Sequence, residues 1–214
     1  MEKVIHQTWK NKELSNSQLE LISSVKNVFC DYEYKFWTDE DNENLIVKNY
    51  PEFHKFYKTL LPVEKSDFVR HLYIHQYGGI YLDIDVKMNK LPVLENADMF
   101  LCDQTKEANI DNFGIIIDPF FLAGNKGYPF FYDICKSIAS GVIYKMLSTV
   151  ITKKYFDTLY KTGPYIVSKF YLLNKDKYNI QILIDVFATL NYESNVPKEN
   201  FYGIHYQLKT WFKL

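Results

Sequence analysis

The sequence predicts an α/β protein with a mostly parallel sheet flanked by helices and a helical C-terminal extension. Three observations support this fold class. In the first half, apolar runs typical of strands alternate with amphipathic runs typical of helices, which is the order of doubly wound parallel sheets. The pattern then becomes mainly helical, and no linker or internal repeat divides the chain. We therefore predict a single domain over 1–214, with an α/β core over 1–130 and a mainly helical tail over 131–214.

The first elements are two strand–helix pairs. Residues 3–8 form a short apolar strand, and residues 16–29 have helical periodicity. A second strand over 34–37 precedes a helix over 38–49, which a threonine or aspartate caps and Pro51 ends. The apolar stripe of the first helix consists of Leu19, Ile22, Val25 and Phe29.

The third helix leads directly into another strand. Ser66 and Asp67 are both good N-cap residues, so we expect the helix to begin at one of them. Its apolar side chains recur at i, i+4 spacing and predict a face that packs on the sheet. The Gly78-Gly79 pair ends the helix and turns the chain into the next strand.

Two carboxylates one residue apart, Asp83 and Asp85, end that strand. Alternation would place both side chains on one face of the strand, roughly 6–7 Å apart. They would repel unless a positive charge lay between them, and Mg²⁺ or Mn²⁺ is the natural candidate. The alternative is a pair of solvated residues at a strand end. Because open α/β sheets bind ligands beyond the carboxyl ends of their strands, the order helix, glycine turn, strand, acidic pair favours a ligand site.

The later elements have weaker patterns. A strand is predicted over 98–102, and an extended segment over 115–123. Helices are predicted over 131–146 and 165–173. The apolar run over 180–188 fits either a strand or a helix.

Composition excludes several classes of protein. A net charge of -1 and a pI near 6.5 give no basic surface for nucleic acid. With 47% hydrophobic and 24% charged residues, the chain is expected to be globular. Its three cysteines have the spacing of neither a disulfide framework nor a zinc site. A strand beginning near Met1 and the lack of a long apolar run favour a cytoplasmic protein without a transmembrane segment, with peripheral membrane contact left open.

Asp67 and Arg70 stand at i, i+3 on the predicted third helix, so their side chains can meet. The usual interpretation is a surface ion pair worth a few tenths of a kcal/mol. Here the pair lies on the helix that leads into Asp83 and Asp85. A sugar hydroxyl could be held between the carboxylate and the guanidinium.

His6, Gln7, Thr8 and Trp9 end the first strand at the same edge of the predicted sheet. Trp9 is either an ordinary core residue or a platform on which a nucleobase stacks. The sequence has no glycine-rich phosphate-binding loop, so a metal ion would have to neutralise the charge of bound phosphates.

The combination of Ile5-His6-Gln7-Thr8-Trp9, Lys65-Ser66-Asp67-x-x-Arg70 and the segment over 78–85 resembles glycosyltransferase family 32, whose members carry a DXD motif. The resemblance is specific over 3–95. It implies a GT-A fold with a Rossmann-like sheet, a nucleotide-diphosphate sugar donor, and transfer with retention of anomeric configuration. Related enzymes include yeast mannosyltransferases and enzymes of capsular polysaccharide synthesis.

The resemblance also implies roles for individual residues. Asp83, preceded by Tyr81, would approach the ribose and sugar of the donor, and Asp85 would bind the metal that bridges the diphosphate. Asp67 and Arg70 would contact hydroxyls of the donor sugar. The His6–Trp9 segment would line the donor site, with Trp9 against the base. Mn²⁺ or Mg²⁺ would act as a Lewis acid and a template, and the helical tail would close the donor and acceptor site.

Two further segments match the family near the end of the chain. His205 followed by Thr210-Trp211 resembles a closing histidine and hydroxyl–tryptophan pair, and His205 is either a further metal ligand or a structural histidine. Gly163-Pro164 matches a pair placed near the donor, or is an ordinary turn.

The chain departs from the family pattern before the apolar stretch that precedes Gly127-x-Pro129, where relatives often have an asparagine that contacts the sugar. Here Pro119 begins the corresponding segment, so Asp118, Asn125 or neither takes that role.

The sequence therefore predicts a metal-dependent, retaining hexosyltransferase that uses a UDP- or GDP-sugar and a glycan or other hydroxyl acceptor. Two alternatives remain. One is an inactive sugar-binding module of the same fold, which would not demand a paired carboxylate metal site. The other is a Mg²⁺-dependent phosphatase of the Asp-x-Asp type, although such enzymes place the motif on the first strand and need a later acidic pair.

Overall fold

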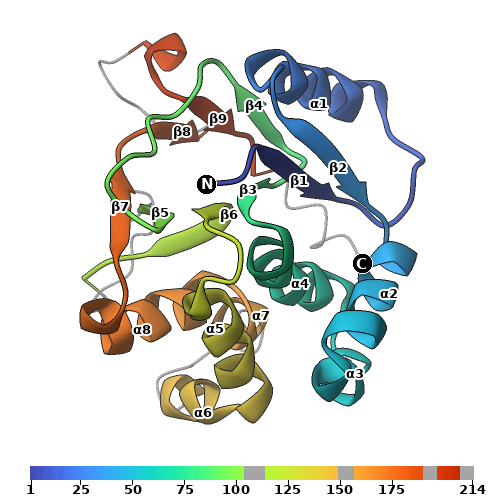
Figure 1. Cartoon of the computed structure of the whole chain (residues 1–214), viewed down its shortest axis with the longest axis vertical. Coiled ribbons are helices and arrows are strands. Elements are labelled where there is room, and N and C mark those ends of the chain that lie inside the picture. The colour runs from blue at the N-terminus through green and yellow to red at the C-terminus, as the bar shows by residue number, and fades with distance from the viewer. Residues whose placement is uncertain (104–113, 149–156, 190–196, 208–214) are drawn as a thin grey trace.

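A central sheet of six strands organises the computed structural model, which describes residues 1–103, 114–148, 157–189 and 197–207. Its strand order is β2-β1-β3-β6-β5-β7 (Figure 1). All strands run in one direction except β6, which is antiparallel to both of its neighbours. The mostly parallel α/β sheet expected from the sequence is therefore confirmed. The strands are β1 (Val4–Thr8), β2 (Glu33–Trp37), β3 (Gly79–Leu82), β5 (Met99–Asp103), β6 (Ile117–Gly124) and β7 (Ile180–Ile184).

A second, three-stranded sheet lies beside the first and has the order β4-β9-β8. It consists of β4 (Val86–Met88), β8 (Phe187–Thr189) and β9 (Gly203–His205). Because β4 follows β3 after a short turn and pairs with β9, the small sheet brings the end of the described chain to the carboxyl end of β3.

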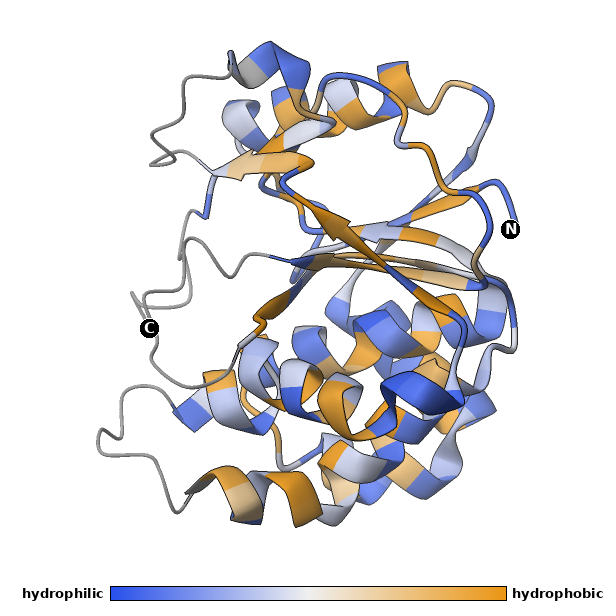
Figure 2. Ribbon diagram, turned by 90° about the vertical axis from the view of Figure 1, so that its left-hand side faces the viewer, coloured by the Kyte–Doolittle hydropathy of each residue, from blue (hydrophilic) through white to orange (hydrophobic). Residues whose placement is uncertain are grey.

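Helices cover the central sheet unequally (Figure 2). One face packs on a layer of helices, whereas the other packs on α1 and the small sheet. Strand alternation sends Tyr81 to the helical layer and Ile80 and Leu82 to the opposite cluster, as predicted. The helices are α1 (Asn16–Val28), α2 (Asp39–Asn49), α3 (Pro51–Tyr57), α4 (Pro62–Tyr77), α5 (Pro129–Ser140), α6 (Val142–Ser148), α7 (Asp157–Lys161) and α8 (Pro164–Asn174).

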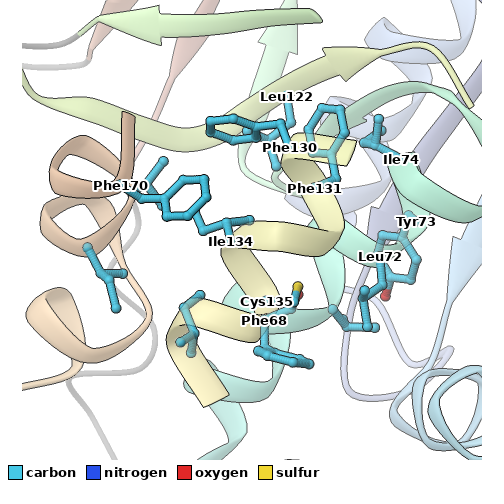
Figure 3. Close-up of a cluster of buried hydrophobic side chains, with 14 of the residues drawn as sticks. Phe68, Leu72, Tyr73, Ile74, Leu122, Phe130, Phe131, Ile134, Cys135 and Phe170 are labelled. Atoms are coloured by element: carbon cyan, nitrogen blue, oxygen red, sulfur yellow. The ribbon is translucent and has the colours of Figure 1, made fainter. Parts of the chain in front are cut away.

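The larger core lies where α4, α5 and α8 meet the sheet (Figure 3). Phe68 of α4, Phe131 of α5 and Leu122 of β6 are all fully buried there. Close aromatic pairs, such as Phe130 with Phe170 at 5.1 Å between ring centroids, join α5 to α8. This packing fixes α4, whose inner turns carry the Asp67–Arg70 pair, against the sheet.

The predicted N-terminal boundary of the third helix is wrong. The helix α4 begins at Pro62, because proline suits the first helical position and the Glu64 carboxylate accepts a hydrogen bond from the backbone N–H of Leu61 at 2.9 Å. Asp67 therefore lies within the helix rather than at its cap. Pro51 likewise begins a helix, α3, besides ending the one before it.

Among the described residues, the last α-helix ends at Asn174 and strands follow it, so the expected mainly helical tail needs correction. The segment over 180–188, which fitted either a helix or a strand, forms β7 and β8. Isoleucines favour strand geometry, and β7 pairs with β5 over its whole length. The predicted helix over 131–146 is divided into α5 and α6 at Gly141, whose φ of 67° is left-handed.

Two other expectations concern single residues and the membrane. Leu19 was placed in the apolar stripe of α1 but is 49% exposed, whereas Ile22, Val25 and Phe29 are buried. In the part of the chain that the structure describes, no helix is long and apolar enough to cross a membrane.

Candidate active site

The acidic pair lies at the carboxyl end of β3, in a turn rather than on a strand. The strand ends at Leu82, and the backbone N–H of Val86 donates to the carbonyl of Asp83 at 3.2 Å. The N–H of Asp83 donates to the carbonyl of Phe120 at 2.9 Å. Asp85 therefore does not occupy the strand position predicted for it, and a turn anchored to β6 brings its carboxylate toward that of Asp83.

His205 completes a cluster with the two carboxylates. Potential ligand atoms of Asp83, Asp85 and His205 all lie within 4.8 Å of one another. The Nε2 atom of His205 is 3.3 Å from Oδ1 of Asp85, and its ring stacks on Phe120 with 4.3 Å between centroids. The pairing of Val86 with His205 in the small sheet fixes this arrangement.

The two carboxylates of this cluster favour a positive charge near them. Burial alone would lower the pKa of His205, but the hydrogen bond to Asp85 and nearby carboxylates raise it to about 9. Nδ1 of His205 is buried without a hydrogen-bond partner among the described residues. Carboxylate oxygens with one imidazole nitrogen form a donor set that suits Mg²⁺ or Mn²⁺. The residues present thus fit a divalent cation.

Arg70 joins the helix motif to the acidic pair. Its Nη2 is 2.8 Å from Oδ1 of Asp67, and its Nη1 is 3.4 Å from Oδ1 of Asp83. The side chains of Arg70 and Asp67 are only 7% and 10% exposed, which excludes the surface ion pair considered from the sequence. Nη1 also donates to the carbonyl of Pro119 at 3.1 Å, so the guanidinium is held by several partners. Burial opposes the charge of Arg70, but the carboxylates around it keep its pKa above the ordinary value.

Asp67 has a second partner on the segment before α8. The hydroxyl of Thr162 donates to Oδ2 of Asp67 at 3.0 Å. Burial raises the pKa of Asp67 to about 6, although Arg70 lowers it in part. Gly163 and Pro164 follow directly and begin α8. A Cβ on Gly163 would lie 2.9 Å from the Cα of Leu159, so packing itself requires glycine there.

Two residues fix the position of Asp83 through hydrogen bonds. The hydroxyl of Tyr81, which is 1% exposed, donates to Oδ1 of Asp83 at 2.6 Å. The amide of Gln7 donates to the carbonyl of Asp83 at 3.1 Å and accepts a bond from Tyr34. Tyr81 and Gln7 were predicted to contact the donor. In the structure, their hydrogen bonds position Asp83.

His6 and Thr8, also predicted at the donor site, are buried and have protein partners. Nε2 of His6 lies 2.9 Å from the carbonyl of Gly78, and Trp37 donates to its Nδ1 at 3.1 Å. Burial lowers the pKa of His6 to about 4, so the ring is neutral and we assign the Nε2–H tautomer. The hydroxyl of Thr8 donates to the carbonyl of Trp37 at 3.0 Å. These hydrogen bonds join the end of β1 to Gly78 and Trp37.

Trp9 is the member of this segment with accessible surface. Its side chain is partly exposed just beyond β1, and its backbone N–H donates to the carbonyl of Trp37 at 3.0 Å. It is therefore not a fully buried core residue. Contact with a nucleobase stays a prediction. Thr210 and Trp211 lie outside the described residues.

The two candidates for the missing asparagine lie at opposite ends of β6. Asn125 follows the strand at the far edge of the sheet, where its amide donates to Oδ1 of Asp98 at 3.1 Å. Asp118 is near the start of β6, beside the carbonyls that bind Arg70 and Asp83. Sequence reasoning missed the roles of Thr162 and Phe120, although both adjoin segments that it had singled out.

Comparison with known proteins decides the family. Residues 15–105 match the family described as "Glycosyltransferase sugar-binding region containing DXD motif". Residues 15–105 of the chain thus carry the sugar-binding region of this DXD glycosyltransferase family. The matched region contains α4, β3 and the acidic turn.

Several of the similar curated proteins are fungal. Inositol phosphoceramide mannosyltransferase 3 of Schizosaccharomyces pombe is 30% identical over 169 residues, which cover 78% of this chain and 43% of that protein. Mannosyl phosphorylinositol ceramide synthase CSH1 of Saccharomyces cerevisiae is 33% identical over 84 residues, which cover 39% of this chain and 22% of that protein. The chain thus spans less than half the length of these relatives.

Solved structures of two toxin domains share the fold. The PaToxG glycosyltransferase has a TM-score of 0.59 at 17% identity, with 81% of this chain and 69% of that chain covered. The ligand-free glycosyltransferase domain of the YGT toxin has a TM-score of 0.58 at 8% identity, with 85% and 80% covered. These likenesses confirm the GT-A fold expected from the sequence.

Proposed function

We propose that the protein transfers a hexose from a nucleotide-diphosphate sugar to a hydroxyl of a glycan or another acceptor, with the help of a divalent cation. The observation that carries this proposal is the cluster of Asp83, Asp85 and His205, with potential ligand atoms within 4.8 Å of one another. Its place at the carboxyl ends of parallel strands is where open α/β sheets bind nucleotides.

The cation would be held by Asp83, Asp85 and His205. Hard carboxylate oxygens favour Mg²⁺ or Mn²⁺, and an imidazole ligand makes Mn²⁺ the first ion to test. When bound, such an ion supplies Lewis-acid stabilisation of the negative charge on the diphosphate leaving group.

The remaining residues of the site orient the donor. Arg70 provides a permanent positive charge beside Asp83, and its hydrogen bonds to backbone carbonyls hold the guanidinium in place before any ligand arrives. Such preorganised charge is effective because it needs no rearrangement during the reaction. Asp67 would accept a hydrogen bond from a hydroxyl of the donor sugar. Trp9 would pack on the base.

The donor and the stereochemistry are the finer parts of the proposal. The names of the fungal relatives refer to mannosyl transfer onto inositol phosphoceramide, so GDP-mannose is the first donor to test. Transfer with retention rests on the family resemblance. Proton NMR of the freshly formed glycoside tests it, since an inverted anomeric signal would contradict retention.

The deciding experiment measures sugar-nucleotide turnover and binding with matched variants. UDP-glucose, UDP-galactose, UDP-N-acetylglucosamine and GDP-mannose are each tested with and without Mn²⁺, by thermal shift and by release of the nucleotide. We expect one donor to stabilise the protein, and Mn²⁺ to enhance the effect. Asp83→Ala and Asp85→Ala should abolish turnover, whereas Glu33→Ala, on the exposed far end of β2, should retain it.

Two outcomes would reject the proposal. Unchanged turnover in both aspartate variants would exclude the site. Release of phosphate from a simple phosphomonoester, without turnover of any sugar nucleotide, would instead favour a phosphatase.

A further inference from the structure

The end of α7 and the turn before α8 lie against α4, the helix that carries Asp67. Two adjacent side chains make the contacts. Nζ of Lys161 is 2.7 Å from Oε2 of Glu64, and the hydroxyl of Thr162 donates to Oδ2 of Asp67 at 3.0 Å. Glu64 and Asp67 stand at i, i+3 on α4, so the two contacts lie one helical turn apart. The first contact secures the start of α4, whereas the second ends on a residue of the proposed donor site.

The hydroxyl of Thr162 is held in place by the backbone on both sides of it. Thr162 is fully buried, and its backbone N–H donates to the carbonyl of Thr158 at 3.0 Å. Gly163, which follows it, packs against Leu159, and Pro164 begins α8 with a fixed φ. The branched Cβ of threonine further restricts its rotamers. The hydroxyl therefore occupies one position before any ligand arrives.

The carboxylate of Asp67 is bound at both of its oxygens. Arg70 binds Oδ1 through Nη2 at 2.8 Å, and Thr162 binds Oδ2. Another acceptor for this hydroxyl, the carbonyl of Thr158, is farther away at 3.4 Å, so the single hydroxyl proton goes to the charged carboxylate. The χ2 torsion of an aspartate has broad preferences, and one bond to Arg70 would leave it free to turn. Thr162 thus fixes the plane of the carboxylate.

Asp67 keeps acceptor capacity in this arrangement. A carboxylate offers about four lone-pair positions, and the bonds from Arg70 and Thr162 use two of them. The side chain of Asp67 is 10% exposed, so a ligand in the site can reach the carboxylate. A hydrogen bond weakens steeply when its angle departs from linear, so the plane of the carboxylate decides how well it accepts such a bond.

We propose that Thr162 is a positioning residue of the transferase, whose hydroxyl holds the carboxylate of Asp67 in the plane that accepts a hydrogen bond from the donor. This inference rests on the proposed function. Lys161 serves as its natural comparison, because it makes the neighbouring contact with α4. The Glu64 carboxylate that Lys161 binds also accepts the N–H of Leu61, so that contact stabilises the helix start and does not orient Asp67.

Matched variants of the two neighbouring contacts test the assignment. Thr162→Val removes the hydroxyl and keeps the branched shape of the side chain. Lys161→Met removes the charge of the other contact and keeps the length of the side chain. The sugar nucleotide that the wild type binds best is used with Mn²⁺. Its affinity is measured by calorimetry, and KM and kcat are measured by release of the nucleotide.

The two variants should differ in donor binding. Thr162→Val should weaken binding and raise KM about tenfold, as expected when a well-aligned hydrogen bond to a charged group is lost. The change in kcat should be smaller, because the bond to Asp67 is present in the bound ground state as well as in the transition state. Lys161→Met should leave affinity and KM within about twofold of wild type, because its contact is separate from the donor.

The free nucleoside diphosphate shows whether the sugar is involved. UDP or GDP, according to the preferred donor, lacks the transferred sugar, so wild type and Thr162→Val should bind it equally with Mn²⁺. Thr162→Ser keeps the hydroxyl and should retain donor affinity within about threefold of wild type. Thr162→Ala places no methyl group against the carboxylate and should reproduce the loss if the valine variant does not fold. Thermal unfolding of each variant reports whether the fold is retained.

Several results would overturn the inference while leaving the proposed function intact. One is equal weakening of donor binding by Thr162→Val and Lys161→Met, because the segment would then act only by holding α4. Others are unchanged donor binding in Thr162→Val, an equal loss for the donor and the free nucleoside diphosphate, or a serine variant as weak as the valine variant. If the wild-type protein neither bound nor turned over any of the four sugar nucleotides, the inference and the proposed function would both fail.

Discussion

At the amino end of the central sheet, Asp98 receives one carboxamide hydrogen bond on each oxygen, from Asn125 and Asn179, both at 3.1 Å. At the carboxyl end, the carboxylates of Asp83, Asp85 and Asp118 lie near Arg70 and His205. The carboxylate of Asp98 is thus hydrogen-bonded to neutral amide groups of the protein on both oxygens.

The carboxylates of the second group repel one another, and two cationic side chains hold them together. This difference indicates which end of the sheet is built for a ligand. An edge that serves only stability pairs its polar groups internally, as Asp98 does. An edge that bound a cation and a sugar, as proposed here, would instead keep charged groups and free lone pairs for them.

Removal of Arg70 should have the largest effect on stability. Arg70→Ala leaves the buried carboxylate of Asp67 without its cation, so we expect the free energy of unfolding to fall by about 3–5 kcal/mol in urea. Lys177→Ala, which breaks an exposed pair with Asp133, should cost far less, because solvent screens that pair. The double variant Arg70→Ala/Asp67→Asn should recover part of the loss. Equal losses for the two single variants would contradict a special role for the carboxyl edge.

His6 should make stability depend on pH. Its pKa is lowered by burial from 6.5 to about 4, so the unfolded chain binds the proton more tightly. The stabilisation is complete above pH 6.5 and is lost as the pH falls toward 4, by about 3 kcal/mol in total. Urea unfolding of wild type and His6→Asn between pH 7 and 4 isolates this contribution. An unchanged difference between the two across that range would refute it.

Mn²⁺ should stabilise the protein by binding at the carboxyl edge of the sheet. At about 100 times its dissociation constant, the ion should add about 2.7 kcal/mol to the free energy of unfolding, and a chelator should reverse the gain. Asp85→Ala should abolish this effect, because it removes a predicted ligand. Asp98→Asn should retain it. Stabilisation of both variants to the same degree would place the ion elsewhere.

The smallest effect is expected at the amino edge. Asp98→Asn weakens the two carboxamide bonds at a partly exposed residue, so we expect a loss of about 1 kcal/mol. Turnover per folded molecule should stay within about twofold of wild type, as measured by nucleotide release at saturating donor. A large loss of turnover would show that the two edges are coupled.

Local patterns in the sequence determined much of the first half of the fold. Periodicity predicted β1, α1, β2 and the carboxyl end of α4, because each is specified by neighbours within a few residues. Spacing at i, i+3 likewise predicted the contact between Asp67 and Arg70. Its burial did not follow from the spacing, because burial depends on what covers the helix.

Tertiary structure alone decided the parts that join distant segments. The pairing of β4 with β9 brings His205 to Asp85, and β6 brings the carbonyls of Pro119 and Phe120 to Arg70 and Asp83. Strand partners and the direction of β6 are set by packing across the whole sheet, and single-strand patterns do not encode them. The sequence by itself thus determined the residues of the acidic motif and the helix that supports it. Only the folded chain decided that a turn carries the two carboxylates, and which side chains surround them.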